Sequence, residues 1–124
     1  MKKVISTDRA PQAIGPYSQA IDLGNRILTS GIIPVDPATG EVKATVNEAA
    51  DQAFLNLKNL LEDAGSGMDK VVKTTVFIAN MDDFAAINEV YAKYFPEPYP
   101  ARSCVEVSRL PKDVLLEVEA IAEK

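Results

Sequence analysis

The sequence predicts an α+β fold, in which two helices pack on one face of a mixed β-sheet. Two stretches carry apolar residues at helical spacing, and six short runs are rich in the residue types that favour strands. Along the chain the expected order is three strands, a helix, a strand, a second helix and two strands. No internal repeat or low-complexity linker interrupts this order, so residues 1–124 are expected to form a single domain.

The N-terminal third of the chain reads as three strands and a loop. The strands are expected over residues 3–5, 18–23 and 26–33. Gly24 and Asn25 supply a tight turn between the second and the third. Residues 34–40 are expected to be a loop, because two prolines lack backbone donors and Gly40 tolerates a positive φ.

The first helix is expected to begin with Asn47 as its N-cap and to run for about five turns. Its apolar stripe has helical spacing and consists of Ala50, Ala53, Leu57, Leu60, Leu61 and Ala64. Gly65 follows where a left-handed residue would end the helix.

The C-terminal half predicts a strand, a helix and two more strands. A β-branched and aromatic strand is expected over residues 71–78, and a helix is expected to start at Asp82 or Asp83. Its apolar stripe is Phe84, Ile87, Tyr91 and Phe95. Prolines 96, 98 and 100 end this helix, and strands follow over residues 101–107 and 115–120.

Composition limits the class of protein. The chain has 124 residues, a net charge of -5 and 25% charged residues, which argues against a nucleic-acid partner that needs clustered Lys and Arg. A single cysteine, no apolar leader and no membrane-length apolar run favour a cytoplasmic protein without membrane partners. A domain this small has little room for a deep cavity of its own, so a site between subunits is expected, and subunit association would also cover the open sheet face.

The candidate chemistry lies in the last two strands of a chain without histidine. Strand alternation places Arg102 and Cys104 on one face of their strand, and Glu117 and Glu119 on one face of the other. If these two strands pair, Arg102 and Glu117 line one small pocket. No cluster of metal ligands is evident in the sequence, so neither a metal nor a cofactor is expected.

Four blocks of sequence resemble the RidA (YjgF) family of imine deaminases. They are APQAIGPYSQA at 10–20, LTSG at 28–31, PARSCVEV at 100–107 and LPKD at 110–113. The resemblance implies a chorismate-mutase-like fold and a homotrimer with clefts between subunits. It also implies hydrolysis of 2-imino or enamine acids to 2-keto acids and ammonia.

Carried over position by position, the resemblance assigns the site. Arg102 matches the arginine that binds the substrate carboxylate, and Glu117 matches the acid that holds or activates water. The positions that line the rest of the pocket are Tyr17, Ser30, Gly31, Asn88 and Cys104. The chain departs from the family at Ile32, where glutamine is common, and it is short between Phe95 and Ala101. Both changes bear on substrate range.

Each site residue also has a structural interpretation. Arg102 could be a surface or ion-paired strand residue, and Glu117 an ordinary solvated acid. Cys104 is read as a small pocket-lining residue and not as a nucleophile, since no histidine could activate it. Asn88 could bond backbone near the cleft, and Tyr17 could be a core or interface aromatic.

Three functions follow as hypotheses. The first is a cofactor-free 2-iminobutanoate/2-iminopropanoate deaminase, which would also act on 2-aminoacrylate. The second is a trimer that binds keto or amino acids through Arg102 without turnover. The third, an endoribonuclease, is least favoured, because the chain is acidic and lacks histidine.

Overall fold

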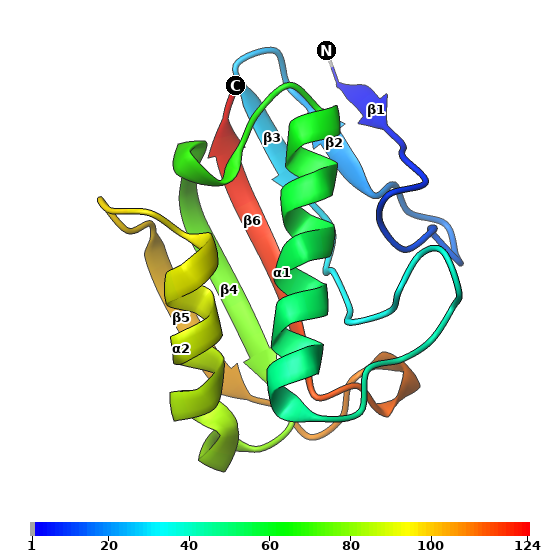
Figure 1. Ribbon diagram of the computed structural model, residues 1–124. Helices are drawn as coiled ribbons and strands as arrows, with labels where there is room; N and C mark the ends of the chain where they lie inside the picture. Colours follow the sequence, from blue (N-terminus) through cyan, green and yellow to red (C-terminus); the bar gives the residue numbers. More distant parts are fainter. Residues whose placement is uncertain (1) are drawn as a thin grey trace.

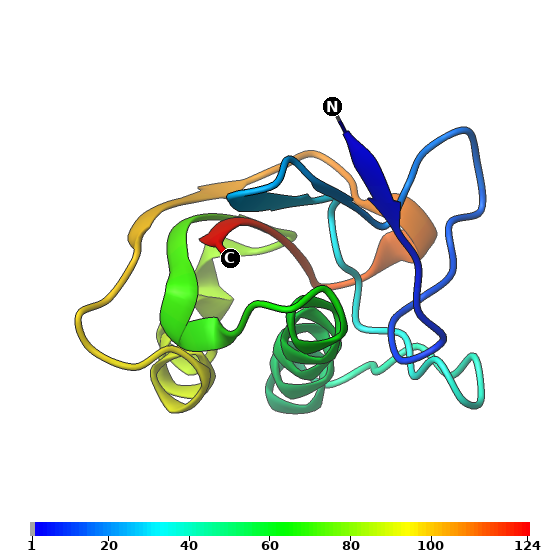
Figure 2. The same cartoon turned by 90° about the horizontal axis from the view of Figure 1, so that it is seen from above.

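The computed structural model describes residues 2–124, and its layers are those that the sequence predicts. Figure 1 shows the sheet behind helices α1 and α2, and Figure 2 shows both helices on the same face of the sheet. The strands are β1 Lys3–Ile5, β2 Ala20–Asp22, β3 Arg26–Thr29, β4 Val71–Ile78, β5 Ala101–Glu106 and β6 Leu116–Glu123. The helices are α1 Val46–Asp63 and α2 Phe84–Tyr94, and short 3-10 turns are Met68–Lys70, Met81–Asp83 and Pro111–Asp113. The expected order of strands and helices is confirmed.

The six strands form one mixed sheet in the order β1-β2-β3-β6-β4-β5. β4 and β5 run parallel, which requires the crossover through α2, and the other neighbouring pairs are antiparallel. The conditional pairing of the last two strands is therefore wrong, because β4 lies between β5 and β6.

Several strand ends differ from the sequence expectation. The second and third strands are shorter than residues 18–23 and 26–33, because regular pairing stops at Thr29 and only Ile32 forms an isolated bridge, to Val118. The last strand continues beyond residue 120 to Glu123, since its C-terminal end pairs with β3. Apolar alternation marks a strand but does not show where its neighbour ends.

The N-cap of helix α1 lies two residues before the expected one. Thr45 is the N-cap, and Asn47 lies inside the helix. The expected stripe is buried against the sheet, and Gly65 follows the helix with a φ of 86°. Within residues 2–124, no helix is both long and apolar enough to cross a membrane.

Helix α2 begins after a turn in which the Asn80 side chain accepts a hydrogen bond from the backbone N–H of Asp82. Its aromatic stripe meets Phe54 of α1. Phe95 stacks on Tyr91 with ring centroids 4.1 Å apart, and Phe54 meets the edge of the Tyr91 ring at 5.5 Å. This aromatic cluster fixes α2 against α1, and the Tyr91 hydroxyl joins it to that of Thr74 on β4.

Candidate active site

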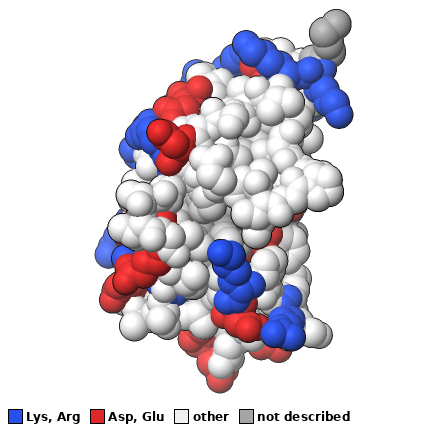
Figure 3. Space-filling model, turned by 90° about the vertical axis from the view of Figure 1, so that its right-hand side faces the viewer, with Lys and Arg blue, Asp and Glu red and all other residues white. Residues whose placement is uncertain are grey.

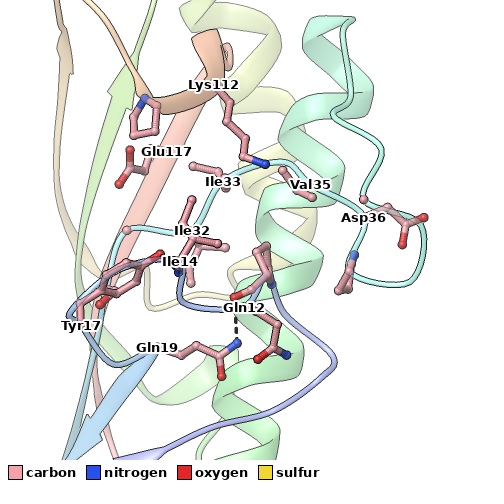
Figure 4. A pocket seen from close by; sticks show the side chains of 16 residues that line it. Gln12, Ile14, Tyr17, Gln19, Ile32, Ile33, Val35, Asp36, Lys112 and Glu117 are labelled. Atoms are coloured by element: carbon pink, nitrogen blue, oxygen red, sulfur yellow. Dashed lines mark hydrogen bonds between the residues drawn. The ribbon is translucent and has the colours of Figure 1, made fainter.

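A cavity of about 560 Å³ opens among the N-terminal loop, the loop after β3 and the turn before β6 (Figure 4). The side of the molecule that these loops form carries a broad area without charged side chains (Figure 3). The residues lining the cavity include four of the expected site residues, Tyr17, Ser30, Gly31 and Glu117. The cavity is therefore the first half of the candidate site.

Glu117 and Gly31 are in direct contact in this cavity. A Cβ atom added to Gly31 would lie 1.7 Å from Oε1 of Glu117, so any larger residue would displace this carboxylate. Glu117 is half-buried, and burial followed by the negative charge of Glu119 raises its pKa above the ordinary value. The cavity therefore holds a carboxyl group that is biased toward accepting a proton.

Ser30 and Tyr17 line the same cavity. The Ser30 hydroxyl donates to the carbonyl of Ser18, and its backbone N–H donates to the carbonyl of Gln19 at 2.9 Å. The Tyr17 hydroxyl accepts from the backbone N–H of Ile14 at 3.3 Å, while the residue remains 50% exposed. Both side chains are thus oriented by local bonds and still open to a ligand.

The cavity walls are held by two buried amides that sequence reasoning did not single out. Gln19 is 4% exposed, and its Nε2 donates to the carbonyls of Thr7, Ala10 and Pro11. Figure 4 shows the Gln19 side chain beside Gln12 at the cavity wall. The sequence signal that could have identified Gln19 is its long polar side chain within the residues expected to form the second strand.

Asn56 of α1 is the second buried amide. It is 0% exposed, and its Nδ2 donates to the carbonyl of Ile33 at 3.1 Å and to that of Val35 at 2.8 Å. Ile32, the departure from the family pattern, is 3% exposed and exchanges backbone bonds with Val118. The loop after Gly31 is thus fixed between α1 and β6.

The rim of the cavity is a strained turn. Lys112 and Asp113 have φ values of 57° and 54°, a backbone conformation that residues other than glycine rarely adopt. Asp113 accepts a hydrogen bond from Nε of Arg109 at 2.8 Å. In Figure 4 the Lys112 side chain extends toward Ile33 and Val35, so a cation lies at the cavity mouth.

Arg102, Asn88 and Cys104 form a second cluster, between β5 and α2. Nη1 of Arg102 donates to Oδ1 of Asn88 at 2.7 Å. The Arg102 guanidinium lies over the rings of Tyr91 and Phe84, 4.8 and 5.5 Å from their centroids. Within one chain, Asn88 therefore bonds the side chain of another candidate site residue.

Cys104 lies beside this cluster as a partly buried thiol. Burial raises its pKa, and the Arg102 charge opposes that shift only in part. A thiol with a raised pKa is less often the reactive thiolate. The raised pKa is what a thiol that is not a nucleophile would have, and Cys104 is not among the residues that line the cavity.

The two clusters lie on opposite faces of the sheet within one chain. Arg102 pairs in register with Thr74, whose hydroxyl contacts α2, and so it faces the helices. Glu117 pairs with Phe77 and lies between the fully buried Leu116 and Val118, so it points to the face without helices. The cavity does not include Arg102, and one chain does not bring Arg102 and Glu117 into one pocket.

The described residues 2–124 contain no group of three or more His, Cys, Asp or Glu side chains placed to hold a metal ion. The candidate site residues form a cationic cluster on the helix-covered face of the sheet, around Arg102, and an acidic cavity that contains Glu117, which points to the other face.

Comparison with known proteins places the chain in a family. The family model described as Endoribonuclease L-PSP matches residues 7–124. The chain belongs to this family, the RidA (YjgF) family that the sequence blocks indicate.

Relatives in this family match over nearly the full chain. The 2-iminobutanoate/2-iminopropanoate deaminase of Escherichia coli is 55% identical over 125 residues, which is 98% of this chain and 98% of that protein. The structure of E. coli TdcF with bound serine is 53% identical, covers 98% of both chains and has a TM-score of 0.94. RidA from a Psychrobacter species is 42% identical over 98% of this chain and 99% of that chain, with a TM-score of 0.95.

Proposed function

We propose that this protein hydrolyses 2-imino acids and their enamine tautomers to 2-keto acids and ammonia, at sites shared between copies of the chain. The observation that carries the proposal is the Arg102 cluster, in a chain 55% identical to a protein named 2-iminobutanoate/2-iminopropanoate deaminase. The substrates would be small imines such as 2-iminopropanoate, 2-iminobutanoate and 2-aminoacrylate.

Arg102 would bind the substrate carboxylate. Its hydrogen bond to Asn88 uses Nη1 and leaves the other guanidinium nitrogens for a planar anion. A guanidinium holds a carboxylate through two parallel bonds, which fixes the orientation of a small imino acid. Binding in this way would place the C2 imine carbon toward the cavity of a neighbouring copy.

Glu117 would position and deprotonate the attacking water. The water oxygen adds to C2 while its proton passes through Glu117 to the nitrogen. The hydroxyl proton then follows by the same route, the carbon–nitrogen bond breaks, and nitrogen leaves as ammonia while the keto oxygen comes from water. An imine carbon is already electrophilic, so modest general-base help is sufficient. Ser30 and Tyr17 would orient the water or the imine nitrogen from the cavity wall.

A homotrimer with shared clefts fits the position of the two clusters. Arg102 and Glu117 face opposite sides of one sheet, and a neighbouring copy can supply the missing half of each site. The open sheet face also carries an apolar row that follows the strand register, Val4, Ile21, Leu28 and Ile121. Val4 is 59% exposed and Leu28 38% exposed, so contact between copies would remove this apolar area from water.

The test is imine hydrolysis in a coupled assay. An amino-acid oxidase generates 2-iminobutanoate from 2-aminobutyrate, semicarbazide traps free imine, and keto-acid release is followed with and without the protein. We expect acceleration by the parent and a loss of about 2–5 kcal/mol for Arg102→Ala, because it removes one partner of an ion pair with the substrate that contact between copies would desolvate. This corresponds to roughly thirtyfold to several-thousandfold in kcat/KM.

Two controls make this test specific. Arg102→Lys should recover little activity, because it retains the charge and loses the planar fork. Arg26→Ala removes an exposed arginine from the start of β3 and should match the parent. If Arg102→Ala stays within about twofold of the parent, the assigned site is wrong.

Binding without turnover is the competing function, and the serine-bound TdcF structure is the observation that favours it. Titration calorimetry with 2-oxobutanoate separates the two. Saturable binding that depends on Arg102, without any acceleration of imine hydrolysis, would support a sensing role in place of an enzyme.

A further inference from the structure

The Arg102 side chain is held by residues of α2 that share one helix face. Phe84, Asn88 and Tyr91 are spaced four and three residues apart, so they lie together on this face. Nη1 of Arg102 donates to Asn88 at 2.7 Å, while its Cζ lies 4.8 Å from the Tyr91 centroid. A largely exposed arginine thus has one polar and two aromatic supports.

Tyr91 is fixed more tightly than a packing residue requires. Its hydroxyl shares a hydrogen bond of 2.7 Å with the hydroxyl of Thr74, and both residues are buried. Phe95 stacks on the ring and Phe54 meets its edge, so ring rotation is blocked from two sides. A leucine or phenylalanine would fill the same apolar stripe without burying a hydroxyl group.

Through Thr74, Tyr91 is also connected to β4, the strand that pairs with the Arg102 strand. Thr74 lies on β4, directly in register with Arg102 on the parallel strand β5. The hydroxyl pair therefore sets the distance between the α2 ring and the β5 arginine. Cation–π contact then favours one guanidinium plane among the many rotamers open to an arginine.

We propose that Tyr91 is a positioning residue for Arg102. Thr74 holds the Tyr91 ring in the position in which it contacts the guanidinium. The inference rests on the proposed role of Arg102 in binding the substrate carboxylate. Tyr91 acts through the guanidinium and does not touch the substrate.

The test is a double-mutant cycle between Tyr91→Leu and Arg102→Ala in the imine assay. We expect Tyr91→Leu to lower kcat/KM by about tenfold or more, mainly through KM, because the guanidinium loses its fixed plane. In the Arg102→Ala background the same change should cause no further loss. Equal losses in both backgrounds would mean that Tyr91 serves only the fold, and would overturn the inference.

Tyr94→Leu is the matched control. Tyr94 lies on the same helix, packs on Phe54 and donates its hydroxyl to Asp51 at 2.8 Å, away from Arg102. It should keep the parent kcat/KM. If Tyr91→Leu does not fold, Thr74→Val combined with Tyr91→Phe removes both hydroxyls at nearly constant volume and should still raise KM.

An NMR readout is independent of turnover. The ring current of Tyr91 should displace the Arg102 Nε–H resonance, and Tyr91→Leu should return it toward the free-arginine position. An unchanged resonance would overturn the inference. A parent-like Arg102→Ala would instead reject the proposed function and the inference together, whereas additive losses with an impaired Arg102→Ala reject the inference alone.

Discussion

At the scale of single residues, the contact between Gly31 and Glu117 gives a clear prediction. An alanine Cβ at Gly31 would lie 1.7 Å from Oε1 and 2.6 Å from Cδ of Glu117, so the carboxylate must move. The obstacle is the end of a side chain, so we expect Gly31→Ala to fold and to lose roughly a hundredfold in kcat.

Circular dichroism and the imine assay check this expectation. Gly15→Ala is the matched control, because its Cβ would meet the Tyr17 ring at an ordinary 3.6 Å. Parent-like kcat in folded Gly31→Ala would show that the position of the Glu117 carboxylate does not matter for turnover.

The raised pKa of Glu117 predicts the pH dependence of activity. As a base toward water, Glu117 must be ionised, so kcat/KM should fall on acidification. The fall should occur at a pH above the pKa of an ordinary carboxyl group. Burial is the first cause and the charge of Glu119 the second, so Glu119→Gln should lower this pKa and move the acid limb to lower pH.

Glu123→Gln on the same strand is the control and should leave the acid limb in place. If Glu119→Gln does not shift the acid limb of the pH profile at low salt, Glu117 is not the titrating group. The contribution of Glu117 to stability changes with pH in the opposite direction to activity. Because folding raises this pKa, the protonated group favours the folded state, and its contribution to the free energy of unfolding is lost as pH rises through the raised pKa.

At the scale of elements, helix α1 holds the cavity wall through Asn56. Asn56→Ala would leave the buried carbonyl of Val35 without its side-chain partner and would remove one of the two donors to the carbonyl of Ile33, which keeps the backbone N–H of Val35. We expect unfolding in urea to show a loss of about 1–3 kcal/mol, together with a higher KM as the loop moves.

Asn59→Ala is the comparison, since Asn59 lies on the same helix and accepts only an exposed bond from Arg9. It should change stability by less than about 0.5 kcal/mol. Equal stability of Asn56→Ala and the parent would mean that α1 does not hold this loop.

At the scale of the whole molecule, the opposite faces of Arg102 and Glu117 predict complementation between subunits. Arg102→Ala and Glu117→Gln should each retain only a small part of the parent activity alone. Co-refolded at equal amounts, they should regain activity at about a quarter of the sites, because random mixing gives some sites both parent residues.

Refolding Arg102→Ala with itself is the control and should restore nothing. Sedimentation should show trimers for the parent and for both variants. A monomer at micromolar concentration, or a mixture no more active than its parts, would contradict the shared site.

The sequence by itself determined the order and approximate place of the strands and helices and which residues share a side of each, because the periods of 2.0 and 3.6 residues are local. Arg102 with Cys104, and Glu117 with Glu119, face as alternation predicts, and the sequence blocks identify the family. Strand ends at Thr29 and Glu123 were not predictable, since they depend on a neighbouring strand.

Only the tertiary structure decided that β4 lies between β5 and β6, and hence that Arg102 and Glu117 face opposite sides of the sheet. It also decided that Gly31 meets Glu117 and that Tyr91 lies beneath Arg102. These contacts join residues far apart in the chain, and they follow from the α2 crossover and from how the helices pack, which local sequence patterns do not specify.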